Sequence, residues 1–230
     1  MKETHIIAGK TVNIFVPSSS KGNISRAIYL NGGYEDADKI WEAFSYEEMK
    51  SALIAIDVTD EWNAALTPYP APRLFKGGED FAGRADSYSN SLMRIMLTAE
   101  ERISEMTGVK VKARAIAGYS LAGLFAVYSF YKTDAFDRLA SMSGSLWFDG
   151  FIEFMRENKL KKVPEKAYFS LGDREKKARN KRMASVEDCT VQAVEIFKEA
   201  GAETLFELNA GGHFDGEIER IVKGLRFIAD

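Results

Sequence analysis

Short apolar runs alternate with segments of helical spacing along most of the chain. Residues 52–57 form a continuous apolar run that ends in an aspartate, which is typical of a strand buried on both faces. Residues 38–49 instead place Ile40, Trp41 and Phe44 on one side of a helix. The same reasoning predicts strands near 11–17, 26–31, 139–143, 166–171 and 204–208, and helices near 87–106, 151–159, 180–200 and 217–228. This alternation favours an α/β fold with a mostly parallel sheet and helices on both faces.

Two segments interrupt the alternation. Residues 18–23 are polar and predict a turn. Residues 62–85 contain three prolines and a Gly-Gly pair and show little periodicity, so we expect a loop. A loop of this length within a domain is usually functional, which places it near the active site in our interpretation. There is no internal repeat, low-complexity segment or linker, so we interpret residues 1–230 as a single domain.

The composition excludes several classes of function. With 230 residues, of which 46% are hydrophobic, the chain can bury a sizeable core. A net charge of −3 provides no basic field for nucleic acid. The single cysteine, Cys189, excludes a disulfide framework and a cysteine zinc site. The start of the chain lacks the apolar core of a signal peptide, and no run is long enough to span a membrane, so we expect a cytoplasmic protein without membrane association.

The segment Gly118-Tyr119-Ser120-Leu121-Ala122-Gly123 joins a strand that begins near residue 109 to a helix that extends to about residue 132. A strand that turns directly into a helix around a serine is the nucleophile elbow, which exposes the hydroxyl at the carboxyl end of the sheet. The sharp turn needs very small neighbours, so Ala122 is a mild departure from the usual glycine. The alternative is a serine that only caps a helix. We interpret Ser120 as a catalytic nucleophile.

A serine hydroxyl needs a base, and the chain has only two histidines, His5 and His213. His213 follows the last predicted strand within Gly-Gly-His, whereas His5 lies on a predicted edge strand near the chain start. We therefore expect His213 to take the proton from Ser120, and activity to fall at acid pH as His213 becomes protonated.

A carboxylate should hold the second nitrogen of the His213 ring. Asp173 and Glu175 both follow the strand near residues 166–171, which gives the chain order serine, acid, histidine. We favour Glu175 and keep Asp173 as the alternative acid. The oxyanion of the reaction needs two N–H donors, for which we expect Leu121 at the helix start and Gly33 after the strand near residues 26–31. This chemistry requires no metal ion and no organic cofactor.

Four motifs resemble the esterase D-like branch of the α/β-hydrolase superfamily, and nearly the whole chain is covered by the resemblance. They are Tyr-Leu-Asn-Gly-Gly at 29–33, the elbow at 118–123, Ser-Met-Ser-Gly-Ser-Leu-Trp at 141–147 and Gly-Gly-His at 211–213. Within that branch, Leu66-Thr67-Pro68 and residues 81–88 look most like the siderophore esterases that open trilactones of the enterobactin type. The resemblance implies an α/β-hydrolase fold and a small ester substrate.

The resemblance also implies roles for particular residues. Ser120 and His213 match the family's nucleophile and base, Glu175 its Gly-x-x-acid position, and Gly33 and Leu121 its oxyanion donors. One departure concerns the substrate. Trilactone esterases tend to have an arginine shortly before Leu-Thr-Pro, where this chain has Trp62-Asn63.

These observations together predict a serine carboxylic-ester hydrolase with a small-molecule ester as its partner. We expect Trp147, Tyr119 and Trp62 to contact the substrate, with Tyr69 and Phe75 nearby in an aromatic cleft. The same residues would also serve an acyltransferase, a thioesterase or a peptidase. Outside enzymes, the alternative is a hydrolase-fold protein that only binds a ligand.

Overall fold

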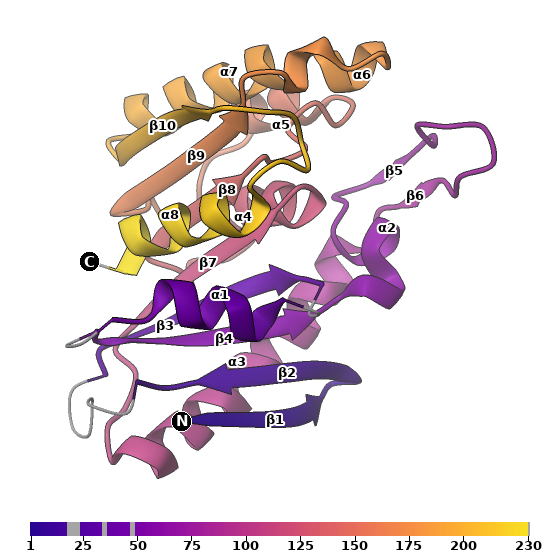
Figure 1. Ribbon diagram of the computed structural model, residues 1–230. Coiled ribbons are helices and arrows are strands. Elements are labelled where there is room, and N and C mark those ends of the chain that lie inside the picture. The colour runs from indigo at the N-terminus through magenta and orange to yellow at the C-terminus, as the bar shows by residue number, and fades with distance from the viewer. Residues whose placement is uncertain (18–23, 34–35, 47–48, 230) are drawn as a thin grey trace.

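Eight strands form the main sheet within the described part of this computed structural model, residues 1–17, 24–33, 36–46 and 49–229 (Figure 1). In spatial order the strands are β1 (Lys2–Ile7), β2 (Lys10–Phe15), β4 (Ser51–Asp57), β3 (Arg26–Gly32), β7 (Ala113–Tyr119), β8 (Arg138–Met142), β9 (Lys166–Gly172) and β10 (Glu203–Asn209). In this order, neighbours from β4 to β10 pair parallel, whereas β1 and β2, and β2 and β4, pair antiparallel. The predicted, mostly parallel sheet is therefore confirmed. The predicted turn at 18–23 lies outside the described residues.

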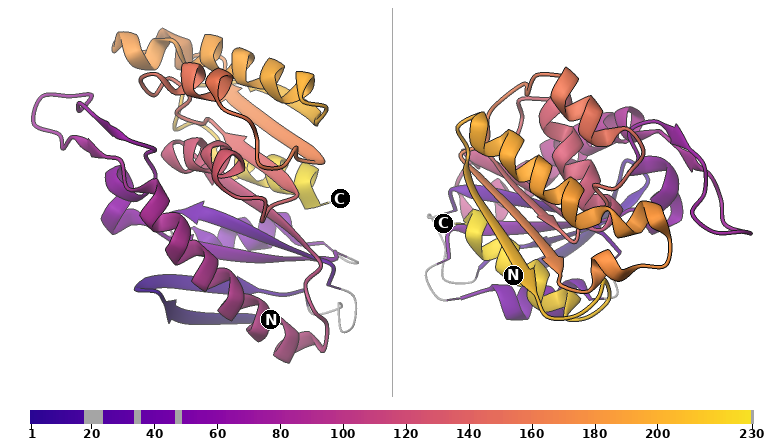
Figure 2. Two further views of the ribbon diagram at one scale, coloured as in Figure 1. Left: turned by 180° about the vertical axis from the view of Figure 1, so that it is seen from behind. Right: turned by 90° about the horizontal axis from the view of Figure 1, so that it is seen from above.

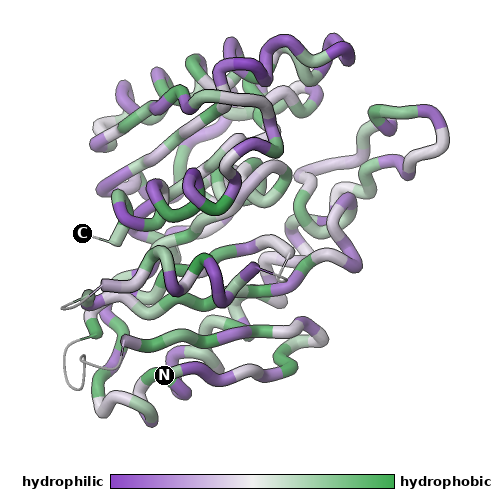
Figure 3. The backbone as a smooth tube through the Cα atoms, viewed as in Figure 1, coloured by the Kyte–Doolittle hydropathy of each residue, from purple (hydrophilic) through white to green (hydrophobic). Residues whose placement is uncertain are grey.

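Helices cover both faces of the sheet, as the alternating pattern predicts. On one face lie α1 (Ala37–Phe44) and α8 (Glu217–Ala229), which share a buried core with the strands. On the other lie α3 (Ala85–Thr107), α4 (Leu121–Lys132), α5 (Phe151–Glu157) and α7 (Val186–Glu199), over a larger core (Figure 2). Figure 3 shows hydrophobic residues concentrated along the central strands and alternating with hydrophilic ones along the helices.

Two predicted helices differ from the observed ones. The helix predicted at 180–200 is divided at Ser185 into α6 (Lys181–Ala184) and α7. The Ser185 hydroxyl donates to the carbonyl of Arg182, which ends the short first helix locally. The helix predicted at 38–49 ends at Phe44, because Ser45 leaves it in an extended conformation; residues 47–48 lie outside the described residues.

The proline- and glycine-rich segment is more structured than the predicted loop. It contains α2 (Trp62–Ala65) and a hairpin of β5 (Pro70–Ala71) and β6 (Phe81–Ala82), which extends away from the sheet (Figures 1 and 2). We call residues 69–83 the arm. Arg182 donates to the carbonyl of Pro72 (2.8 Å) and Asn180 to that of Leu74 (3.0 Å), so the arm is fastened to the segment around α6. The pattern missed these elements because they are too short to show a period.

No helix in the described part of the chain combines the length and apolarity that a membrane span requires.

Candidate active site

Ser120 stands at the turn from β7 into α4 with φ 58° and ψ −124°, which is an unfavourable backbone conformation for a residue with a side chain. The turn is stabilised by close packing of small residues. A Cβ atom on Gly118 would lie 2.3 Å from the backbone of Ala122, so only glycine fits there, and its absence leaves room for the methyl group of Ala122. The strained serine expected at an elbow is therefore present, and Ala122 fits without disturbing it.

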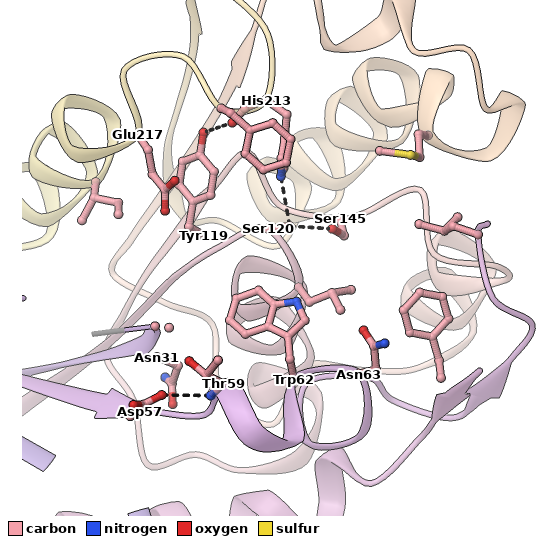
Figure 4. A pocket seen from close by; sticks show the side chains of 18 of the residues that line it. Asn31, Asp57, Thr59, Trp62, Asn63, Tyr119, Ser120, Ser145, His213 and Glu217 are labelled. Atoms are coloured by element: carbon pink, nitrogen blue, oxygen red, sulfur yellow. Dashed lines mark hydrogen bonds between the residues drawn. The ribbon is translucent and has the colours of Figure 1, made fainter. Parts of the chain in front are cut away.

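His213 lies in the loop after β10, with its ring between Ser120 and Glu175. Its Nε2 is 3.1 Å from the Ser120 hydroxyl oxygen (Figure 4). Its Nδ1 is 2.8 Å from Oε2 of Glu175. An ionised carboxylate only accepts hydrogen bonds, so Nδ1 carries the proton and donates to Glu175. Nε2 is then an acceptor, and the Ser120 hydroxyl donates to it. This arrangement has the geometry of a serine with its general base.

The two alternatives to these residues face elsewhere. Asp173 accepts a hydrogen bond from the N–H of Gly211 (3.0 Å) at the base of the histidine loop. His5 lies on the edge strand β1, with Nε2 2.8 Å from a carboxylate oxygen of Glu3. Glu175 and His213 are thus the acid and the histidine that the fold brings to Ser120.

Glu175 belongs to a short 3₁₀ helix, Glu175–Lys177, just beyond β9, and is 8% exposed. Its Oε1 accepts from the Ser143 hydroxyl (2.7 Å) and from the N–H of Gly172 (2.6 Å), which leaves Oε2 for His213. Burial raises the pKa of Glu175, but the hydrogen bonds from His213, Gly172 and Ser143 outweigh it and hold the pKa below its ordinary value. The carboxylate is therefore ionised at neutral pH.

Two serines of the Ser-Met-Ser-Gly-Ser run belong to the site, although sequence reasoning assigned them no role. Ser143, which has φ 45°, donates to Glu175 as described. The hydroxyl of Ser145 lies 3.4 Å from that of Ser120 (Figure 4). The backbone N–H of Ser145 donates to the Ser120 carbonyl (3.0 Å). The close repetition of small polar residues after a buried strand was the available signal.

A cavity of about 970 Å³ opens in front of Ser120. It includes both expected oxyanion donors, Gly33 and Leu121, and the three expected substrate contacts, Trp62, Tyr119 and Trp147. The arm contributes Phe75, which is 61% exposed. Tyr69, which we expected nearby, is not among the described residues that line the cavity. Its ring packs against Phe148, and its hydroxyl donates to the carbonyl of Asp149.

The charged groups around the cavity are mostly acidic. Among the described residues, the lining has one arginine, Arg73, against five carboxylate residues: Asp36, Asp57, Asp60, Glu79 and Glu217. Partial burial raises the pKa of Glu217, and the nearby Asp36 raises it further, although His213 and Arg220 act in the opposite direction. The cavity is therefore better suited to neutral or positively charged groups than to several negative charges.

The described residues contain no group of three or more His, Cys, Asp or Glu side chains placed to hold a metal ion.

Strand order, helix layers and the position of the serine turn define the α/β-hydrolase fold, as the sequence predicted. No family model matches the chain. The uncharacterised protein YbbA of Bacillus subtilis is 22% identical over 205 residues, which make up 86% of this chain and 81% of YbbA.

Solved structures show the same fold over nearly the entire chain. An IroE-like serine hydrolase from Shewanella oneidensis has a TM-score of 0.80 at 14% identity, covering 98% of this chain and 79% of that one. The siderophore hydrolase EstA from Aspergillus nidulans has a TM-score of 0.75 at 19% identity, and the match covers 99% of this chain and 94% of EstA. The enterobactin and salmochelin hydrolase IroE has a TM-score of 0.73 at 16% identity, and the match covers 100% of this chain and 94% of IroE. The expected resemblance to siderophore esterases is thus confirmed, at identities that establish the fold alone.

Proposed function

We propose that this chain is a serine carboxylic-ester hydrolase in which Ser120 is the nucleophile, His213 the base and Glu175 the acid. The observation that supports it best is the continuous hydrogen-bonded series from the Ser120 hydroxyl through His213 to Glu175. It begins at a strained turn and faces a cavity of about 970 Å³. The named activities of the similar structures, serine hydrolase and siderophore hydrolase, point in the same direction.

The proposed reaction has two steps. The Ser120 oxygen attacks the ester carbonyl carbon while its proton moves to Nε2 of His213. The N–H groups of Leu121 and Gly33 receive the resulting oxyanion, at the start of α4 and after β3. The intermediate expels the alcohol, which takes the proton from His213. Water, activated by His213, then hydrolyses the acyl group on Ser120 and releases the carboxylic acid.

Glu175 stabilises the imidazolium that forms in each step. Its ionised state at neutral pH, which the depressed pKa favours, suits that role. The substrate we propose is a small ester, such as a siderophore-like lactone, whose acyl part contacts Trp62, Tyr119 and Trp147. The acidic lining favours a neutral or cationic ester over a polyanionic one, which agrees with the missing arginine at Trp62-Asn63.

Hydrolysis of p-nitrophenyl acetate and butyrate tests the proposal. We expect turnover by the wild type and a loss of several orders of magnitude, on the order of 10⁴-fold or more, in Ser120→Ala and His213→Ala. His5→Ala is the matched control, since His5 lies at the far edge of the sheet, and it should retain activity. A folded wild type that hydrolyses neither ester, or a fully active Ser120→Ala, would contradict the proposal.

A further inference from the structure

An arginine is buried directly behind the candidate active site. Arg220 lies in the first turns of α8, and its side chain is only 2% exposed. A buried guanidinium is strongly unfavourable unless acceptors match its N–H groups. Its partners therefore indicate what this arginine does in the folded protein.

One end of the guanidinium contacts the residues that hold the acid. Nη1 of Arg220 donates to Oε1 of Glu175 (3.1 Å), to the Ser143 hydroxyl oxygen (3.0 Å) and to the Tyr119 hydroxyl oxygen (3.2 Å). Oε1 of Glu175 also accepts hydrogen bonds from the Ser143 hydroxyl and the Gly172 N–H, so three donors surround it. The carboxylate cannot rotate without losing these bonds, so Oε2 stays directed at His213.

The other end of the guanidinium contacts the loop that carries the histidine. Nη2 of Arg220 donates to the carbonyl oxygens of Gly212 (2.9 Å) and Ala210 (3.3 Å). The Tyr119 hydroxyl, which accepts from Arg220, itself donates to the His213 carbonyl (2.6 Å). The backbone on both sides of the histidine ring is therefore tied to the same buried group.

We propose that Arg220 is a positioning residue, which aligns Glu175 with His213 by holding the carboxylate and the histidine loop at once. The role rests on the proposed function of Ser120 and His213. Among the described residues, Arg220 is not itself part of the cavity lining, and its hydrogen bonds go to Tyr119, Ser143, Glu175 and the histidine loop rather than to Ser120, so it acts through the residues it binds. A planar guanidinium can serve both sets of acceptors because its N–H groups form a rigid fork, which a lysine lacks.

Several titratable groups lie around the guanidinium and interact electrostatically with it. They come from β7, β9, the segment after β9, the loop before α8 and α8 itself, and are Tyr119, Tyr168, Glu175, His213, Asp215 and Glu217. Loss of the positive charge leaves the Glu175 carboxylate without its buried cation. The pH profile of kcat should therefore change in a variant without this charge and stay unchanged in one that keeps it.

The test compares Arg220→Met, Arg220→Lys, Glu175→Gln and the double variant Arg220→Met/Glu175→Gln with the wild type. Arg226→Met is the matched control, because Arg226 lies on the exposed side of the same helix and donates to the Ala43 carbonyl. A fluorophosphonate probe counts the reactive serines in each preparation, and kcat is then expressed per reactive site. The double variant removes both members of the buried pair, which protects folding better than removing one.

We expect Arg220→Met to lower kcat per site about 100-fold with KM changed by less than about twofold. Arg220→Lys should recover the wild-type pH profile but only part of kcat, and Arg226→Met should match the wild type. In the Glu175→Gln background, replacing Arg220 should change kcat by less than about threefold, because both substitutions break the same alignment.

Two results would overturn the positioning role while leaving the proposed function intact. One is an unchanged kcat per reactive site together with a lower melting temperature, which is the signature of a residue that only stabilises the fold. The other is a drop of about 100-fold in kcat when Arg220→Met is added to Glu175→Gln, because two residues that act through one alignment would not give independent losses. A wild type that neither turns over esters nor reacts with the probe instead contradicts the proposed function, and the role of Arg220 with it.

Discussion

Glu175 and His213 meet although 38 positions separate them, with Oε2 of the carboxylate 2.8 Å from Nδ1 of the imidazole. The other oxygen of Glu175 accepts from Gly172 and Ser143. Asp173, only two residues earlier, accepts from the N–H of Gly211 instead. The two candidate acids therefore have separate tasks, and substitutions of each should differ widely in effect.

We expect Glu175→Gln to lower kcat by about 10³- to 10⁴-fold, because the neutral amide cannot stabilise the imidazolium. Asp173→Asn should lower kcat by less than about tenfold, since its side-chain oxygen can still accept from Gly211. Steady-state kinetics on p-nitrophenyl butyrate measure both. Equal losses in the two variants, or a larger loss in Asp173→Asn, would show that the acid is wrongly assigned.

The same carboxylate should make stability depend on pH. The pKa of Glu175 in the folded protein lies below its ordinary value of 4.5, because its hydrogen bonds outweigh the effect of burial. The ionised group therefore stabilises the fold above its unfolded pKa, and this contribution is lost as the pH falls through the folded pKa.

Urea unfolding of wild type and Glu175→Gln between pH 7 and pH 3 measures this contribution. The difference in free energy of unfolding should stay constant above about pH 5.5 and shrink below it. A difference that remains constant down to pH 3 would mean that Glu175 titrates alike in the folded and unfolded chain.

The serine turn should tolerate one exchange of small residues and reject the other. Gly118→Ala places a Cβ atom 2.3 Å from the Ala122 backbone, so the turn must shift and kcat should fall about 100-fold or more. Ala122→Gly supplies the usual residue of the motif and should cost about 1 kcal/mol of stability with little change in kcat. Full activity in Gly118→Ala would show that the close packing is not needed.

The acidic cavity predicts selectivity for charge. We expect kcat/KM for matched p-nitrophenyl esters to be higher with a terminal trimethylammonium or methyl group than with a carboxylate, by about tenfold at low salt. The difference should shrink with added salt and in Glu217→Gln, but not in the control Glu195→Gln on the exposed face of α7. A preference for the carboxylate ester would contradict this view of the substrate.

Much of the fold follows from local patterns in the sequence. The apolar run at 52–57 and the abrupt change at 118–123 identify a buried strand and a serine turn without any distant information. His213 could be selected because the chain has one alternative histidine, on an edge strand. These predictions depend only on residue type, spacing and the rule that sites lie at the carboxyl ends of strands.

Other features depend on contacts that no local pattern reveals. Asp173 and Glu175 both follow the end of β9 at Gly172 closely, and only the turn into the 3₁₀ helix directs Glu175 toward His213. Arg220 stands between Glu219 and Ile221 in the sequence, and neither neighbour indicates whether its side chain is buried. It is buried because the loop before α8 folds over it. The hairpin in the arm consists of two-residue strands, which are too short for alternation to appear.

The most direct measurement is the site of covalent labelling by a fluorophosphonate, located by intact-mass and peptide mass spectrometry. We predict one adduct per chain, on the peptide that contains Ser120, and none in a folded Ser120→Ala variant. His213→Ala should label far more slowly, because the Ser120 hydroxyl would lack its base. An adduct on another residue, or rapid labelling of Ser120→Ala, would contradict the assignment of Ser120 as the nucleophile.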